Sequence, residues 1–277
     1  MTCCNVLLKE TPMLPLQDLR DADLARIDGL FLDIDDTLTT DGRLPAQAYA
    51  ALEALHDSGL LVVPITGRPA GWCDHFARMW PVDAVVGENG AFYFWHDHEA
   101  KKLRQRFLAD EATRAANALR LKAVAADILQ AVPGCALASD QFCRIADIAI
   151  DFCEDVPALP KSKVERIATL MREAGMTAKI SSIHVNGWFG DYDKLSMTRM
   201  LMRERYGIDL DSARQRYLFI GDSPNDEPMF GYFPQAVGVA NVVAFAKDMT
   251  HPPAYVTNGR GGNGFVELAE RLLAVRR

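Results

Sequence analysis

The chain has 277 residues, of which 49% are hydrophobic and 24% charged, as in ordinary folded proteins and unlike disordered or fibrous chains. Its net charge of −7 disfavours nonspecific binding to nucleic acid, because the phosphates would repel it. No apolar run approaches the ~20 residues that a membrane span requires, and residues 1–28 lack the features of a signal peptide. We therefore expect a cytoplasmic protein that binds neither nucleic acid nor membrane, whose six cysteines are incidental reduced thiols.

Short apolar runs that end in polar or glycine residues alternate with helical patterns along much of the chain. The apolar runs span residues 30–32, 60–65, 84–86 and 217–220. Helical patterns cover residues 45–57, a segment after Arg68, and residues 195–206. This alternation predicts an α/β fold with a doubly wound, Rossmann-like parallel sheet. Ligands bind such sheets at the carboxyl ends of the strands.

The middle of the chain has a different pattern. Residues 91–108 are predicted to form a hairpin with a polar tip, and residues 113–132 and 161–174 to form helices. Strand-like alternation covers residues 148–152, and the chain returns through a strand over residues 179–186. We expect an α+β domain inserted into the sheet domain. The predicted division is a core of residues 1–90 and 187–277 and an insert of residues 91–186.

Four polar segments stand at predicted strand ends or helix starts, and together they suit phosphoryl transfer. They are Asp33-Ile34-Asp35-Asp36-Thr37-Leu38, Thr66-Gly67-Arg68, Asp193-Lys194 and Gly221-Asp222-Ser223-Pro224-Asn225-Asp226. A carboxylate can attack phosphorus, and Mg²⁺ is held by one or two carboxylates together with substrate phosphate. Lysine, hydroxyl and backbone N–H groups neutralise the phosphoryl oxygens. A second acid protonates the leaving oxygen and later activates water.

In this order, the four segments resemble the four motifs of the haloacid dehalogenase superfamily. The resemblance implies that Asp33 is the nucleophile, transiently phosphorylated, and a metal ligand. It also implies that Asp35 is the general acid and base, with its backbone carbonyl on the metal. The ion-pumping ATPases of the superfamily have threonine at that position, so an aspartate at 35 implies fast hydrolysis.

The resemblance also assigns the groups that bind phosphate and metal. Phosphate would be bound by Thr66, Gly67, Lys194 and Asn225, of which Thr66 and Lys194 are also catalytic. The Mg²⁺ ligands would come from Asp33, Asp35, Asp222 and Asp226. Asp36 stands where many members have glycine, and we expect a solvated turn carboxylate there.

The position of the insert, between the second and third motifs, resembles the type-two (subclass B) cap of sucrose- and trehalose-phosphate phosphatases. The implied function is Mg²⁺-dependent hydrolysis of a phosphomonoester, a sugar phosphate or similar small metabolite. A phosphomannomutase-like sugar phosphomutase has the same cap and stays open as the alternative. A phospho-accepting receiver domain would lack the insert, and a non-catalytic binder would normally have lost Asp33, Asp35 or Lys194. The sequence carries no signal of oligomeric state.

Several residues outside the motifs have two interpretations each. If Ile183 and Val185 face the cap interior, His184, Asn186 and Trp188 face away and could contact a sugar, although a half-solvated strand surface explains them equally well. Residues 88–90 suit a hinge turn better than a ligand contact. Arg68 suits either an anion contact or a surface salt bridge. The remaining motifs are discounted: His96 and His98 as a hairpin tip, and residues 259–264 as a glycine-rich loop before the last helix.

Overall fold

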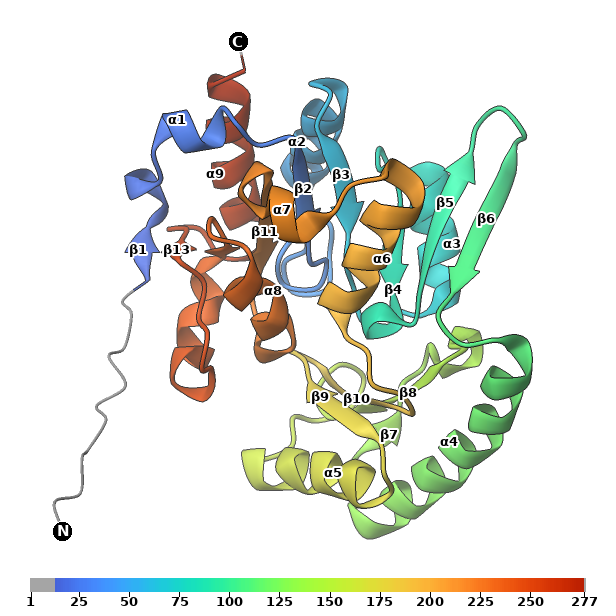
Figure 1. Ribbon diagram of the computed structural model, residues 1–277. Helices are drawn as coiled ribbons and strands as arrows, with labels where there is room; N and C mark the ends of the chain where they lie inside the picture. The colour runs from blue at the N-terminus through green and yellow to red at the C-terminus, as the bar shows by residue number, and fades with distance from the viewer. Residues whose placement is uncertain (1–12, 277) are drawn as a thin grey trace, which may run out of the picture.

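The computed structural model of the protein describes residues 13–276, so Cys3, Cys4 and the start of the N-terminal segment lie outside the described residues. The chain forms two lobes (Figure 1). The larger lobe is an α/β core, and the smaller lobe, which we call the cap, carries helices α4 and α5 and its own sheet. The predicted fold class is confirmed. None of the described helices is long and apolar enough to cross a membrane.

The core is built on a six-stranded sheet in which every neighbouring pair is parallel. Its strands, in spatial order, are β1 (Leu14–Pro15), β13 (Tyr255–Val256), β12 (Val237–Gly238), β11 (Tyr217–Gly221), β2 (Gly29–Leu32) and β3 (Leu61–Pro64). Strands β2 and β11 are adjacent and wholly buried. Because parallel strands end at one edge, the segments that follow β2, β3 and β11 meet there.

Helices cover both faces of this sheet. One face packs against α2 (Ala46–Asp57), α3 (Ala70–Met79) and α9 (Gly261–Ala274), and the other against α6 (Lys194–Tyr206) and α8 (Glu227–Tyr232). Short helices α1 (Asp21–Leu24) and α7 (Leu210–Ala213) complete this lobe. Alternate residues of β2 point to opposite faces: Leu30 and Leu32 join the first cluster, and Phe31 joins the second. The sheet is therefore doubly wound, as predicted.

Helix α6 shows how local sequence positions a functional side chain. The Asp193 carboxylate accepts the backbone N–H of Ser196 at 2.8 Å, and the Ser196 hydroxyl accepts the N–H of Asp193 at 2.9 Å. This reciprocal capping box starts the helix at Lys194. The helix ends at Gly207, which adopts φ 66°. Lys194 is thereby held in the first turn, and the predicted helix begins one residue too late.

The predicted hairpin is present as β5 (Phe92–Asp97) and β6 (Lys102–Phe107), but it belongs to a sheet of its own. It pairs antiparallel with β4 (Val85–Gly87), which is bridged to the core sheet between Ile65 and Val86. The hairpin therefore lies beside the core (Figure 1). The predicted boundaries of the insert, residues 91–186, remain a prediction.

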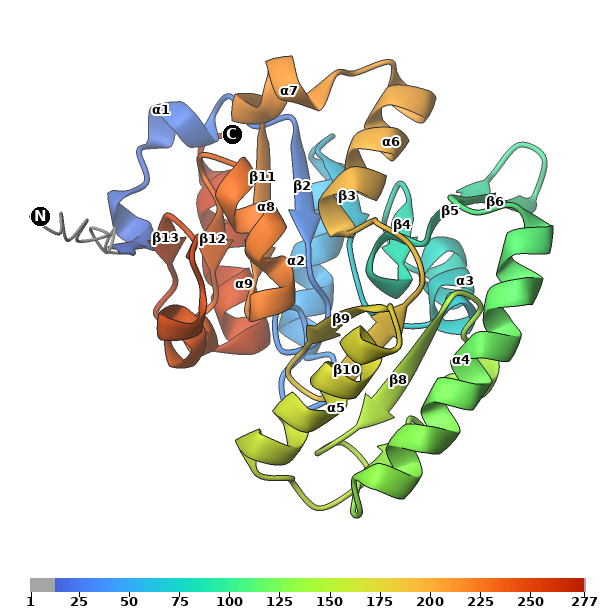
Figure 2. The same cartoon turned by 60° about the horizontal axis from the view of Figure 1, so that its bottom comes forward.

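The cap is a four-stranded antiparallel sheet covered by two helices (Figure 2). Its strands, in spatial order, are β7 (Ala136–Leu137), β8 (Asp147–Asp151), β10 (His184–Trp188) and β9 (Thr177–Ile180), and its helices are α4 (Glu111–Ala131) and α5 (Lys161–Glu173). The single strand predicted over residues 179–186 is wrong, because the chain reverses at residues 181–183. The Ser181 hydroxyl supports this turn by accepting the backbone N–H of His184 at 3.1 Å.

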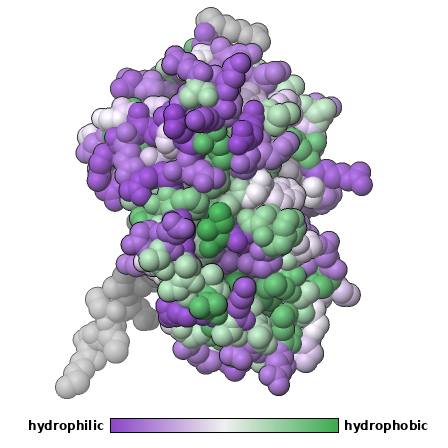
Figure 3. All heavy atoms as spheres, turned by 90° about the vertical axis from the view of Figure 1, so that its right-hand side faces the viewer, coloured by the Kyte–Doolittle hydropathy of each residue, from purple (hydrophilic) through white to green (hydrophobic). Residues whose placement is uncertain are grey.

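The two lobes differ in how their surfaces are composed on the side seen in Figure 3. The core half of this face is mostly hydrophilic, whereas apolar residues gather over the cap and its junction with the core (Figure 3). The junction is tightly packed at α3, where a side chain at Gly71 would meet the Cys143 side chain at 2.7 Å. The cap is therefore seated directly on the core.

Candidate active site

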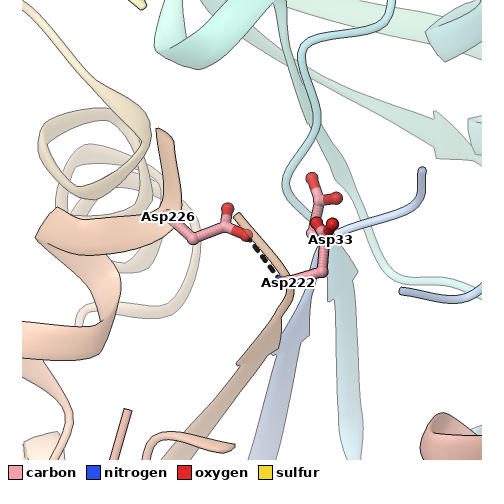
Figure 4. Close-up of side chains that lie close together, drawn as sticks. All are labelled: Asp33, Asp222 and Asp226. Carbon is pink, nitrogen blue, oxygen red and sulfur yellow. Dashed lines mark hydrogen bonds between the residues drawn. The ribbon is translucent and has the colours of Figure 1, made fainter. Parts of the chain in front are cut away.

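Three aspartates converge at the carboxyl edge of the central strands. Asp33 follows β2, Asp222 follows β11, and Asp226 lies in the 3₁₀ turn Pro224–Asp226. All three are buried, and their carboxylate oxygens lie within 4.8 Å of one another (Figure 4). We call these three residues the aspartate cluster. The structure thus brings together three of the predicted metal ligands.

Lys194 joins two members of the aspartate cluster. Its Nζ lies 2.6 Å from Asp33 Oδ1 and 2.6 Å from Asp226 Oδ1, and the side chain is only 1% exposed. The other Asp226 oxygen accepts the backbone N–H groups of Asp222, at 3.0 Å, and Ser223, at 3.4 Å. Asp226 therefore holds both Lys194 and the loop after β11, and Figure 4 shows the second of these contacts, to Asp222.

The aspartate cluster carries more negative charge than its surroundings offset. Burial raises the pKa of Asp33 to about 8, against the opposing effect of Lys194 and with the help of Asp226. Burial, followed by the repulsion of Asp33, also raises the pKa of Asp222. Burial alone would lower the pKa of the Lys194 amine, but Asp226 and Asp33 raise it above its ordinary value. Three carboxylates and one ammonium leave two negative charges when all are ionised.

This imbalance fits a divalent cation. An all-oxygen donor set suits hard cations such as Mg²⁺, and two positive charges would balance the aspartate cluster together with Lys194. Asn241, which the sequence analysis missed, supports the arrangement, because its Nδ2 donates to Asp222 Oδ2 at 3.2 Å and to the Asp36 carbonyl at 2.9 Å. The residues present therefore fit a magnesium site.

The segment after β3 is shaped as a loop with free donors. Thr66 is buried, and its hydroxyl oxygen accepts the backbone N–H of Arg68 at 3.0 Å, which leaves the hydroxyl proton free to donate. Gly67 lines the pocket beside Asp33, and its carbonyl accepts Nη1 of Arg144 at 2.9 Å. The cap thus reaches the predicted phosphate-binding loop through Arg144.

Arg68 forms a buried bridge between Asp35 and the cap. Its Nε and Nη2 lie 3.0 and 2.8 Å from Asp35 Oδ1, and its side chain is 6% exposed. Nη2 also donates to Glu154 Oε1 at 2.9 Å, and Nη1 to Asp140 Oδ2 at 3.4 Å. Burial alone would lower the pKa of Arg68, but Asp35 and Glu154 raise it above its ordinary value. Of the two interpretations of Arg68 offered by the sequence, the surface salt bridge is wrong, because the ion pairs of Arg68 are buried.

Asp33 of the aspartate cluster faces a small pocket between core and cap, which we call the catalytic pocket. Six of the predicted catalytic, metal and substrate residues line it, namely Asp33, Asp35, Gly67, His184, Asn186 and Asn225. The volume of the catalytic pocket is about 20 Å³. Ile183 also lines it, rather than the cap interior as the alternation predicted.

The polar side chains of strand β10 that line the catalytic pocket also have partners within the cap. Val185 packs in the cap interior, as expected. His184 Nε2 lies 2.9 Å from Glu154 Oε2, and Asn186 Nδ2 donates to Asp147 Oδ2 at 3.1 Å, so both are tied within the cap. Trp188 instead stacks on Tyr192, with ring centroids 5.4 Å apart, in the core cluster. Trp188 is therefore a packing residue.

Residues 88–90 anchor the cap. Glu88 is fully buried, and its carboxylate accepts the backbone N–H groups of Ile145 at 2.9 Å and of Ala146 at 2.5 Å. It also accepts the N–H of Ala70 at the start of α3. Glu88 and Asn89 have φ values of 44° and 54°, in the left-handed region. The turn is therefore a contact between the two lobes as well as a change of direction.

The sequence analysis missed most of this contact. Asp140, Arg144, Asp147 and Glu154 lie within one segment of the cap, but Glu88 is more than 50 positions away in the chain, and no spacing rule relates it to that segment. Their role at the contact between core and cap becomes visible only from the ion pairs and hydrogen bonds of the folded structure. The residues next to them in the sequence do not predict it.

Glu154 provides a test of this contact through pH. Its pKa is lowered to about 2 by the hydrogen bond with His184 and by Arg68, from an ordinary 4.5. A carboxyl with a lowered pKa stabilises the fold above its unfolded pKa, and the effect is lost as the pH falls from 4.5 toward 2. We expect Glu154→Gln to lower the free energy of unfolding by about 1–2 kcal/mol at neutral pH. The difference from wild type should shrink below pH 4.5.

Denaturant titrations at several pH values measure this difference, with Glu165→Gln on the exposed face of α5 as the control. A difference that stays constant through the acidic range would contradict the assigned interaction.

Comparisons with known proteins agree with this geometry. Residues 30–128 match the sequence model of a family described as haloacid dehalogenase-like hydrolase. None of the curated proteins compared with the chain matches it. The C-terminal domain of C. albicans trehalose-6-phosphate phosphatase is 15% identical, with a TM-score of 0.69 over 95% of this chain and 98% of that chain.

Two further solved structures have the same fold. The Synechocystis sucrose-phosphatase is 15% identical, with a TM-score of 0.61 over 89% of this chain and 98% of that chain. A sugar phosphatase of haloacid dehalogenase subclass IIB is 16% identical, with a TM-score of 0.60 over 88% of this chain and 98% of that chain. The match over residues 30–128 and the shared fold confirm the predicted resemblance to the haloacid dehalogenase superfamily, to whose subclass IIB one of these neighbours belongs.

Proposed function

We propose that the protein is a Mg²⁺-dependent phosphomonoester hydrolase that acts through a phosphorylated Asp33. The observation that carries the proposal is the aspartate cluster bridged by Lys194, with Asp33 facing a pocket that Asp35, Gly67 and Asn225 also line. This arrangement brings together a nucleophile, a site for a cation and groups that can donate hydrogen bonds to phosphate. Thr66 and Lys194 would bind phosphate from the inner side, and Gly67 and Asn225 from the pocket.

In the first step, Asp33 attacks the phosphorus of the ester. Because Lys194 engages Oδ1 of Asp33, Oδ2 is the oxygen that we propose as the nucleophile. An oxygen–phosphorus bond forms to Asp33 while the bond from phosphorus to the ester oxygen breaks, and Asp35 donates a proton to that oxygen. Lys194 and Thr66 offset the charge on the phosphoryl oxygens.

In the second step, water replaces Asp33 on phosphorus. Asp35, now a carboxylate, accepts a proton from the water as it attacks, and the bond from phosphorus to Asp33 breaks, which releases phosphate. Arg68 orients Asp35 for both roles through its contacts at 3.0 and 2.8 Å. Asp33 and Asp222, with Asp226 and the Asp35 backbone, would hold Mg²⁺, which when bound supplies positive charge to the phosphoryl oxygens.

The proposed substrate is a sugar phosphate or similar small metabolite, selected by the insert of residues 91–186. The names of the neighbours support it, because two of them are phosphatases of disaccharide phosphates. We further propose a cytoplasmic site of action with neither nucleic acid nor membrane as partner, as the composition suggests.

Phosphate release tests the proposal. We expect hydrolysis of small phosphate esters that requires Mg²⁺, stops on addition of EDTA and resumes when Mg²⁺ is restored. Isomerisation of a sugar phosphate without release of phosphate would favour the mutase alternative. Release that is unaffected by EDTA would remove the magnesium role.

Asp35→Asn is expected to slow both steps, because asparagine neither donates a proton to the leaving oxygen nor accepts one from water. The steady-state rate should fall about 10²–10⁴-fold. With an activated ester, whose leaving group needs no proton, phosphoenzyme should accumulate. It would be visible as an increase of about 80 daltons in intact mass, which is the mass of an added HPO₃ group. Unchanged turnover in this variant would contradict the acid–base role.

A further inference from the structure

The catalytic pocket is too small for a whole substrate. Its volume of about 20 Å³ is close to the space that one ordered water occupies. Even a phosphoryl group exceeds that volume, so the rest of an ester must lie outside the catalytic pocket. The leaving group of the ester must therefore lie in a cavity next to the catalytic pocket.

A second, much larger cavity adjoins it, and we call this the side cleft. The volume of the side cleft is about 700 Å³, which is within the range of small-molecule sites. Ser181 and Ser182, in the turn between β9 and β10, line both the catalytic pocket and the side cleft. Across from the cap, the side cleft is bounded by Pro224, which directly precedes Asn225 of the catalytic pocket. The turn at residues 181–183 therefore borders both cavities, which places the side cleft next to the catalytic pocket.

The walls of the side cleft are partly apolar. Side chains from both lobes contribute, namely Phe152, Leu159, Val164, Ile180 and Phe245. The first four come from the cap and Phe245 from the core. Each is partly or wholly buried, yet each reaches the cleft surface. Such a surface favours a ligand with an apolar portion.

Charged side chains of both signs line the side cleft, namely Lys161, Arg172 and Lys179 together with Glu165 and Glu227. Within residues 13–276, neither Lys179 nor Arg172 forms an ion pair, and both line the side cleft. The Glu227 carboxylate is already engaged, because its Oε1 accepts the backbone N–H groups of Thr250 at 2.7 Å and of His251 at 2.9 Å. Two cations are therefore available to a ligand.

We propose that the leaving group of the substrate occupies the side cleft and carries both an apolar portion and a second negative charge beyond the scissile phosphate. The proposal rests on the phosphatase function and narrows its substrate class. A neutral disaccharide would leave Lys179 and Arg172 without a partner and would contact the apolar wall with hydroxyl groups. A phosphorylated aromatic or similarly apolar acid satisfies both features.

The test compares acetyl phosphate, an acyl phosphate with a small leaving group, with two aryl phosphate esters that differ from each other in one charge. Acetyl phosphate reports on the catalytic pocket alone, because its leaving group is too small to extend further. The phosphate esters of 4-hydroxyphenylacetate and of 4-hydroxyphenylacetamide have nearly equal leaving groups and shapes and differ in one charge. We expect kcat/KM to be about tenfold higher for the acid than for the amide, as for one charged hydrogen bond.

Matched variants locate the preference. The double variant Lys179→Gln/Arg172→Gln should reduce the ratio of acid to amide to about one, if those cations supply the charged contacts. Hydrolysis of acetyl phosphate should not change in it. Lys122→Gln, an exposed cation on α4, should keep the full preference. Phe245→Ala should lower kcat/KM for both aryl esters and leave acetyl phosphate unaffected. Melting temperatures verify that the variants fold.

The outcomes distinguish failure of the side-cleft proposal from failure of the phosphatase function. Hydrolysis of acetyl phosphate with no preference between the two aryl esters overturns the side-cleft proposal and leaves the phosphatase in place. A preference that survives in the double variant also overturns it. Absence of hydrolysis for all three compounds contradicts the phosphatase function and, with it, the side-cleft proposal.

Discussion

Asp33→Asn is expected to abolish phosphate release, by about 10³-fold or more, as when a catalytic nucleophile is removed. An amide oxygen in place of the carboxylate is a poor nucleophile and gives no aspartyl-phosphate. The amide also keeps the size of the side chain and one oxygen near Lys194, which is 2.6 Å from Asp33 Oδ1 in the wild type. The lost rate therefore reports on chemistry and not on the fold.

The same variant should keep or raise the melting temperature in the absence of Mg²⁺. Burial and the neighbouring Asp226 raise the pKa of Asp33, which means that its ionised form is disfavoured where it stands. Asparagine removes that charge from the aspartate cluster. Asp36→Asn is the matched control, because Asp36 lies in the same loop with φ 55° and asparagine tolerates this conformation.

Phosphate release and thermal unfolding on both variants measure these effects. Activity of Asp33→Asn within tenfold of wild type would remove Asp33 as the nucleophile. If Asp36→Asn also lost most of its activity, the substitutions would be acting by disturbing the loop after β2 and not by removing the Asp33 carboxylate.

The central part of the site was predictable from the sequence because it depends on local rules. Asp33 and Asp222 directly follow buried strands, and parallel strands deliver such residues to one edge. Lys194 starts a helix whose capping residue, Asp193, is its neighbour in sequence. Each of these positions follows from an apolar run or a helix signal a few residues long. Their convergence then requires only that the sheet be parallel.

The contact between the two lobes was not predictable in this way. Arg68 meets Glu154 across 86 positions, and Glu88 meets Ile145 across 57. Such pairs depend on how the cap is seated, and no short pattern encodes that placement. The same holds for the hairpin of residues 92–107: its alternation predicts two strands but does not decide which sheet they join. The reversal at residues 181–183 was missed because two serines can continue a strand as well as turn it.

Lys194→Met is expected to impair both the chemistry and the fold. Methionine fills much of the same volume but has no charge, so phosphate loses one hydrogen-bond donor. The activation free energy should rise by about 2–4 kcal/mol, which lowers the rate by about 30- to 10³-fold. Without Mg²⁺, the variant also leaves Asp33 and Asp226 buried without their shared cation. Breaking a buried pair from one side costs about 3–5 kcal/mol of stability.

Mg²⁺ distinguishes these two consequences. A divalent cation that binds the aspartate cluster of the folded state stabilises it by mass action, and its charge replaces part of what Lys194 supplied. The stability deficit of Lys194→Met should therefore shrink as Mg²⁺ is added, whereas the rate deficit should persist, because the donor to phosphate is still missing. Unfolding and phosphate release across a Mg²⁺ titration measure both, with Lys122→Met as the exposed-lysine control. A loss of stability that Mg²⁺ does not reduce would mean that the cation binds elsewhere. An unimpaired rate would mean that Lys194 holds the aspartates together without contacting the phosphate.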